Sequence, residues 1–146
     1  MIVAGLDVDT HKAAYCVWNG REAIAYGTMT KREELRHFVN LKVDVVYVEE
    51  TPFCKNAQTM RKLAQAVGVW LERIDNWGIR GLTLPVGKWK SLSLGIGNAT
   101  KAQVKDIILA TTNMPNGLPQ DCYDACGLSL AGYALEKQAD LVSRAG

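Results

Sequence analysis

Two aspartates, Asp121 and Asp124, lie three residues apart in the stretch LPQDCYDACG (118–127), where a helix is predicted to begin. Residues at i and i+3 share one face of a helix, so the two carboxylates repel each other. Such a pair can hold a hard divalent cation through its oxygens. Acids are also favoured in the first turn of a helix, where free N–H groups and the helix dipole stabilise negative charge. This stretch alone leaves both interpretations open.

Two further acids end apolar segments that read as strands. Asp7 closes MIVAGLD at the start of the chain, and Glu49 follows VDVVYV (43–48). A helical crossover would bring the second of these strands back parallel to the first. If the two strands are neighbours, Asp7 and Glu49 lie at one edge of the sheet, where ligands of open α/β sheets gather.

Four carboxylates from three separated segments would repel one another unless cations neutralise them. Mg²⁺ is held by one or two carboxylates together with phosphate oxygens. Two such ions ~4 Å apart can bind the attacking water and the leaving oxygen of a phosphodiester. The four acids therefore predict metal-dependent hydrolysis by in-line displacement, without an organic cofactor or a covalent intermediate.

The strands that position these acids follow from the hydrophobic pattern. The pair Asn19-Gly20 predicts a hairpin turn between strands at 13–18 and 22–29. Further strands are expected at 1–8, 43–48 and 78–84. The order of elements indicates an α/β domain with a mixed five-stranded sheet flanked by helices.

Helices are predicted between and after these strands. A capping box at Thr30 and Glu33 starts a helix that ends at Asn40, with three residues on its inner face: Leu35, Phe38 and Val39. The segment 56–73 keeps helical spacing through five apolar residues, Ala57, Met60, Ala64, Val67 and Leu71. Helices at 99–112 and 119–140 finish the chain, and the glycine- and lysine-bearing segment 85–98 reads as a loop.

Composition sets broader limits. The chain has 146 residues, of which 48% are hydrophobic and 22% charged, as expected for one globular domain spanning 1–146. No apolar run approaches a membrane span, and the first residues lack a basic signal-peptide region, so we expect a cytoplasmic protein. Its four cysteines show no metal-binding spacing and are expected to be reduced.

Charge is unevenly distributed along the chain. Residues 55–105 hold nine Lys and Arg against two acids, a net +7, so the remainder carries −5. A basic middle with acidic ends suits a polyanion whose backbone is bound by one part and cut by another. A solvated basic surface explains the charge equally well.

With these spacings the chain resembles the RuvC-type Holliday junction resolvases, within the RNase H-like superfamily. The resemblance rests on three stretches, GLDVD (5–9), VEETPFCKNAQTMRKLAQAVGV (48–69) and KSLSLGIGNATKAQV with PQDCYDA (90–104 and 119–125). It implies an RNase H-like fold and a nuclease of four-way DNA junctions. Its metal ligands fall on Asp7, Glu49, Asp121 and Asp124.

The same resemblance places DNA-binding residues. Lys101 and Lys90 match lysines that approach the scissile phosphate and its flanking backbone, and Lys55 and Asn56 match phosphate contacts at a helix start. The aromatic residue that probes the junction in the family falls on Pro52, beside Phe53, which therefore either stacks on an unpaired base or belongs to the core. We also expect Trp89, between Lys88 and Lys90 in the predicted loop, to contact DNA.

One departure from the family lies next to the first aspartate. The usual Pro-Gly is replaced by Val8 and Asp9, and Asp9 is a candidate auxiliary metal ligand. The resemblance further implies two Mg²⁺ or Mn²⁺ ions per site, a nucleoid location, and branch-migration or replication proteins as partners.

A symmetric junction requires two opposed nicks, which favours a homodimer. We expect the helix at 56–73 at its interface, because the apolar stripe continues into Val69 and Trp70.

Rival functions remain open on sequence grounds. The catalytic domain of a related transposase or recombinase would share the four acids but is expected to carry a further C-terminal domain. Another branched-DNA nuclease would differ only in substrate. An actin-like or sugar-kinase ATPase begins similarly but needs a second phosphate loop and a longer chain. A non-catalytic DNA-binding module would not need all four acids.

Overall fold

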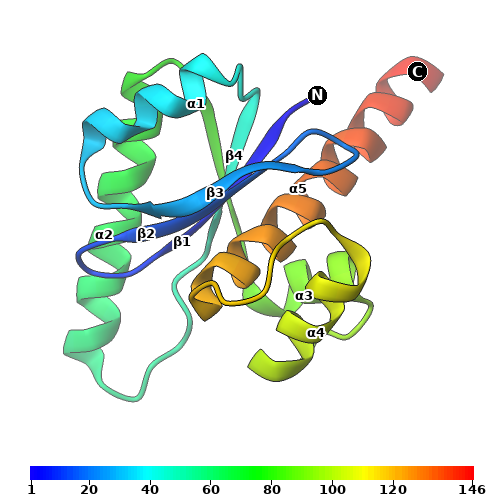
Figure 1. The fold of residues 1–146 in the computed structure, drawn as a ribbon. Coiled ribbons are helices and arrows are strands. Elements are labelled where there is room, and N and C mark those ends of the chain that lie inside the picture. The colour runs from blue at the N-terminus through cyan, green and yellow to red at the C-terminus, as the bar shows by residue number, and fades with distance from the viewer.

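A mixed sheet of five strands forms the centre of the computed structural model, which describes residues 1–146 (Figure 1). In spatial order the strands are β3 (Ala23–Met29), β2 (Ala13–Trp18), β1 (Val3–Val8), β4 (Val45–Glu49) and β5 (Arg80–Leu84). β1 pairs antiparallel with β2 and parallel with β4, and β4 pairs parallel with β5. This arrangement confirms the predicted fold class and the neighbouring placement of the two acid-bearing strands.

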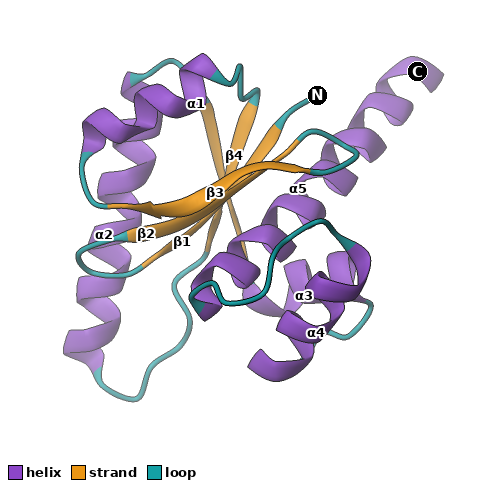
Figure 2. Ribbon diagram, viewed as in Figure 1, coloured by secondary structure: helices purple, strands orange, loops and turns teal.

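Helices cover both faces of the sheet (Figure 2). One face carries the 3₁₀ helix η1 (Arg32–Leu35), α1 (Arg36–Asn40) and α2 (Ala57–Asn76). The other carries α3 (Val86–Leu94), α4 (Lys101–Thr111) and the long α5 (Gln120–Ala145). Among these helices, none combines the length and apolar character needed to cross a membrane.

Successive side chains of a strand point to opposite faces of the sheet, so the sheet divides the hydrophobic core into two parts. Val3 and Val45 point to the α5 face, whereas Leu6 and Val46 point to the α2 face. Each set belongs to its own cluster of buried side chains, and the α5-side cluster includes Trp89. The strands that end in acids are therefore held on both faces.

Helix α5 lies directly against β1, because Gly5 has no side chain. A Cβ atom at Gly5 would overlap the carbonyl oxygen of Ala125 and lie 2.7 Å from the amide nitrogen of Ser129. The first turns of α5 are thereby drawn to the end of β1. This contact sets the distance between the acids of the strand and those of the helix.

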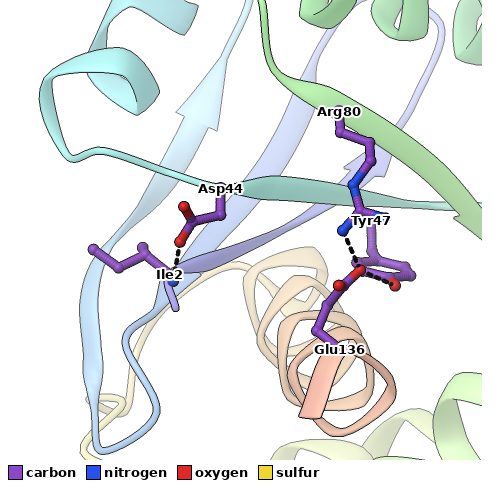
Figure 3. Close-up of polar contacts among 5 residues, drawn as sticks. All are labelled: Ile2, Asp44, Tyr47, Arg80 and Glu136. Carbon is purple, nitrogen blue, oxygen red and sulfur yellow. Dashed lines mark hydrogen bonds and ion pairs between the residues drawn. The ribbon is translucent and has the colours of Figure 1, made fainter. Parts of the chain in front are cut away.

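Polar contacts fix α5 to the sheet at its other end (Figure 3). The Tyr47 hydroxyl donates a hydrogen bond to Glu136 at 2.8 Å, and Arg80 forms an ion pair with the same carboxylate oxygen at 2.6 Å. Asp44, which precedes β4, accepts a hydrogen bond from the amide of Ile2 at 2.7 Å. The contacts of Glu136 join β4, β5 and α5, and that of Asp44 joins the start of β4 to the start of the chain, away from the carboxyl ends of the strands.

Two local predictions were wrong. The segment 85–98 is not a loop, since it contains α3, which begins after Pro85 and ends at Gly95 with a left-handed φ of 77°. Thr30 and Glu33 form no capping box, because the backbone N–H of Thr30 donates to Glu34 and a 3₁₀ turn precedes α1. Leu35 and Phe38 are buried as predicted, but Val39 is 42% exposed.

The buried face of α2 also differs from the prediction. Val67 is buried as predicted, but the other buried residues are Trp70 and Ile74, whereas Ala57 and Ala64 are exposed. The first turns of α2 extend beyond the sheet, so they have no surface to cover (Figure 1). The helix itself begins after Asn56, as expected, and runs slightly longer than predicted.

Candidate active site

The carboxyl ends of β1 and β4 carry Asp7 and Glu49 on the same face of the sheet. In β1 the side chains of Val3 and Asp7 lie on the same face, because they are an even number of residues apart, and the same holds for Val45 and Glu49 in β4. Val3 and Val45 face α5, so both acids face α5 as well. Val3 pairs with Val45, and the same register places Asp7 beside Glu49. The parallel pairing thus explains why two acids distant in sequence meet.

The first turns of α5 add Asp121 and Asp124 to this edge. Carboxylate oxygens of Asp7, Asp121 and Asp124 lie within 4.8 Å of one another. Glu49 lies close enough to hydrogen-bond with Asp7. All four predicted acids therefore border one open pocket of about 420 Å³.

Burial and the closeness of the acids raise the pKa values of Asp7 and Asp124. Burial raises the pKa of Asp7 to about 9, and the negative charges of the three other carboxylates add to the rise. Burial also raises the pKa of Asp124 to about 6, although a hydrogen bond from Gln120 and the charge of Lys101 oppose the rise. Both pKa values rise because the buried carboxylates lose contact with water and face other negative charges.

The cluster suits a divalent cation. Its donors are all carboxylate oxygens, the ligand type that Mg²⁺, Mn²⁺ and Ca²⁺ prefer. A bound cation would offset the repulsion that raises the pKa of Asp7. Asp7, Asp121 and Asp124 would be its nearest ligands, with Glu49 beside them.

Addition of Mg²⁺ should therefore raise the midpoint of thermal unfolding, and more so at about pH 8 than at about pH 5. The pKa values of Asp7 and Asp124 are raised above the value near 4 of an unfolded chain, to about 9 and about 6. The metal-free folded state thus binds more protons than the unfolded state, and its stability falls as the pH rises across this range. Scanning fluorimetry with Mg²⁺ or with a chelator measures the difference. An unchanged midpoint in millimolar Mg²⁺ at the higher pH would contradict a cation site.

Trp89 does not contact solvent, so its predicted role as a DNA contact is wrong. The side chain is 1% exposed and belongs to the core between α3 and α5. Its indole Nε1–H donates a hydrogen bond of 3.0 Å to Oε1 of Glu49. The sequence does not indicate this contact, because the pattern of 85–98 is that of a loop.

Two lysines border the pocket. Lys101 is the first residue of α4 and is exposed, and its charge reaches Asp124. Lys90 is half-buried and donates a hydrogen bond of 2.8 Å to the carbonyl oxygen of Ala99, which holds the loop before α4. Gln120, which the sequence did not single out, donates at 3.0 Å to the carbonyl oxygen of Lys101 and at 3.5 Å to Asp124.

The remaining predicted residues lie around the pocket rather than in it. Lys88 and Lys55 are exposed, on α3 and before α2. The side-chain oxygen of Asn56 caps α2 by accepting from the amides of Gln58 and Thr59, at 3.0 Å and 3.1 Å. Phe53 is 87% exposed, which rules out a place in the core.

Asp9 lies at the pocket edge but outside the cluster of three carboxylates. Its Oδ1 accepts a hydrogen bond of 2.7 Å from the amide of Thr10, just beyond the end of β1.

Comparison with known proteins identifies the family. Residues 23–132 match the family described as crossover junction endodeoxyribonuclease RuvC. A protein of that name from Citrifermentans bemidjiense is 34% identical over 87 residues, which cover 60% of this chain and 53% of the relative. This chain therefore matches about half the length of that relative. A protein of the same name from Delftia acidovorans is 31% identical over 155 residues, covering 93% of this chain and 81% of the relative.

Solved structures agree in fold. Thermus thermophilus RuvC in complex with a Holliday junction substrate superposes with a TM-score of 0.83 at 17% identity, covering 95% of this chain and 96% of that one. The fowlpox virus resolvase in complex with Holliday junction DNA superposes with a TM-score of 0.60 at 18% identity, covering 93% and 98%. The sheet order, the family match and these superpositions agree, and the chain belongs to the RuvC family of crossover junction endodeoxyribonucleases.

Proposed function

We propose that this protein is a metal-dependent endonuclease that resolves four-way DNA junctions by paired hydrolysis of phosphodiester bonds. The observation that carries the proposal is the meeting of four carboxylates from β1, β4 and α5 in one pocket, with Lys90 and Lys101 at its border. Membership of the RuvC family supports the same activity. The family match also argues against the transposase and ATPase functions considered from the sequence.

Within this proposal, Asp7, Glu49, Asp121 and Asp124 hold two Mg²⁺ ions, or Mn²⁺ in their place. Such ions lower the pKa of a bound water and stabilise the charge that develops on the phosphate. The protein fixes the donor oxygens, because the strand register and the close contact at Gly5 set their spacing. A water oxygen adds to phosphorus as one P–O ester bond breaks, and the products are a phosphate monoester and a free hydroxyl.

Positive charge around the pocket would hold the DNA backbone. Lys101 is free to reach a phosphate next to the cluster, while Lys90 stabilises the loop before α4 and retains further N–H donors. Lys55 and the amide group of Asn56 would contact phosphate from the exposed start of α2, and Lys88 from α3. Phe53 would stack on an unpaired base at the branch point.

Replacing Lys101 by Ala should slow cleavage about 10²-fold, as expected for the loss of one donor to a developing negative charge. Loss of one phosphate contact should also make junction binding less sensitive to salt. The slope of log affinity against log salt concentration should fall in magnitude by about one. Single-turnover cleavage and binding at several salt concentrations measure the two effects. Lys137→Ala is the matched control, since this exposed lysine lies about 20 Å along α5 from Asp124. Equal behaviour of the two variants would make Lys101 an ordinary surface charge.

A homodimer is part of the proposal, because resolution needs two nicks related by the symmetry of the junction. The exposed face of α2 is the candidate interface. Ala64 is exposed, Val69 is 44% exposed, and a Cβ built at Gly68 meets no atom within 4 Å apart from its chain neighbours and the backbone of its own helix. Trp70, which the sequence placed in the same stripe, is only 4% exposed and packs inside the monomer. Branch-migration or replication proteins would supply the junctions.

A panel of substrates tests the proposed activity. The protein and Mg²⁺ are incubated with a four-way junction, a linear duplex, a Y-fork and an RNA–DNA hybrid. We expect rapid cleavage of the junction alone. Equal cleavage of the Y-fork would indicate a general branched-DNA nuclease, and cleavage confined to the hybrid would indicate an RNase H-type activity.

A further inference from the structure

Trp89 occupies an unusual place for a core residue, because its polar edge faces the active site. The ring is 1% exposed, and its Nε1–H donates to Oε1 of Glu49 at 3.0 Å. An indole is a donor only, so this carboxylate satisfies its whole hydrogen-bonding capacity. The remainder of the ring belongs to the apolar core between α3 and α5.

Contacts with α5 fix the position of this ring. A Cβ atom at Gly127 would lie 2.5 Å from Cζ3 of Trp89, so the ring fits only against a glycine. Gly127 follows Asp124 by three residues on the same helix. Helix α5 therefore supplies both acids of the cluster and the surface that orients the indole.

Glu49 needs such support more than its neighbours do. A glutamate has three side-chain torsions to be fixed, and the negative charge of Asp124 lies near enough to act on Glu49. A hydrogen bond from a buried, rigid donor opposes that repulsion. The indole takes up one lone pair of Oε1 and leaves Oε2 available to a cation.

We propose that Trp89 is a positioning residue that holds the Glu49 carboxylate in the orientation required to bind the metal. The inference rests on the proposed metal-dependent nuclease function. Groups that hydrogen-bond a metal ligand typically change metal affinity about 10- to 100-fold when they are removed. Trp89 thus links the packing of α3 against α5 to the affinity of the site.

The first test is metal binding by the protein without DNA. Trp89→Phe keeps an aromatic ring in the core and removes the N–H donor. We expect its affinity for Mn²⁺, measured by calorimetry, to fall about 10- to 100-fold. Trp77→Phe is the matched control, because Trp77 also donates one hydrogen bond, at 3.2 Å to the carbonyl oxygen of Arg32, outside the pocket. An unchanged affinity in Trp89→Phe would overturn the proposal and leave Trp89 as a packing residue.

The second test uses the protein with Trp89 in place. The protein has four tryptophans, so four indole N–H resonances are expected in a ¹⁵N spectrum. The Trp89 resonance should move on addition of Mg²⁺ and in the Glu49→Gln variant, whereas the Trp77 resonance should stay in place. If Trp89→Phe fails to fold, this spectrum decides alone, and a Trp89 resonance insensitive to both changes would refute the inference.

Glu49→Gln also separates this inference from the proposed function. If Glu49→Gln binds Mn²⁺ as tightly as the parent protein, Glu49 is not a ligand, so its part in the proposed metal site and the positioning role of Trp89 both fail. If Glu49→Gln weakens Mn²⁺ binding and Trp89→Phe does not, only the positioning role of Trp89 fails. We expect both variants to weaken binding, and Trp89→Phe to cause no further loss in the Glu49→Gln background.

Discussion

Asp7→Asn should abolish junction cleavage, by more than about 10³-fold, while leaving junction binding intact. Asp7 lies at the centre of the cluster, since its pKa responds to all three other carboxylates. The amide of Asn keeps the size of the side chain but lacks the charge that holds a cation. Affinity for DNA depends mainly on phosphate contacts with Lys and Arg, which this change leaves in place. Glu49→Gln is expected to behave in the same way.

Single-turnover cleavage and binding of the same labelled junction measure the two quantities, with Ca²⁺ or a chelator present for binding. Asp44→Asn is the matched control, because Asp44 also accepts a hydrogen bond but lies at the opposite end of β4 (Figure 3). It should cleave at the parent rate. Parallel loss of binding and cleavage in Asp7→Asn would assign Asp7 to folding rather than to catalysis.

Gly68→Arg should dissociate the proposed dimer, weakening self-association about 10²-fold or more. Near a two-fold axis each new charge faces its own copy, so repulsion acts across the interface. Arginine has a higher helix propensity than glycine, and a Cβ at this exposed position meets no atom within 4 Å apart from its chain neighbours and its own helix backbone, so the monomer should not lose stability. Analytical ultracentrifugation measures the association. Junction products should change from paired to single nicks.

Ala134→Arg serves as the control, because Ala134 is an exposed helical residue on α5 and receives the same charge. It should remain a dimer. A parent protein that is monomeric at micromolar concentration and binds the junction one-to-one would disprove the homodimer, without affecting the metal site.

The acids were predictable because simple geometric rules place them. Parallel neighbouring strands end at one edge, which unites Asp7 with Glu49, and helical spacing aligns Asp121 with Asp124. Each rule uses local sequence or sheet topology. The distance between the two pairs depends instead on Gly5, whose close contact with α5 is visible only in the folded structure.

The environment of Trp89 could not be predicted, because its partners Glu49 and Gly127 are distant in sequence. Glycines and lysines in 85–98 gave no clear period, and a tryptophan between two lysines suggested a nucleic-acid contact. The tertiary contact with Gly127 and the hydrogen bond to Glu49 decide its environment instead. The face of α2 was misassigned for a related reason: alanines fit an apolar stripe, but the first turns of this helix have no sheet beneath them.

Mapping of the cleavage sites on a four-way junction with a mobile branch point tests the central claim most directly. Each of the four strands is end-labelled in turn and incubated with the protein and Mg²⁺. The proposed activity predicts symmetric nicks in two opposing strands, no cleavage of the linear duplex, and no product with a chelator or with Asp7→Asn. A junction that is bound but left uncut in Mg²⁺ and in Mn²⁺, or a duplex cut as fast as the junction, would contradict it.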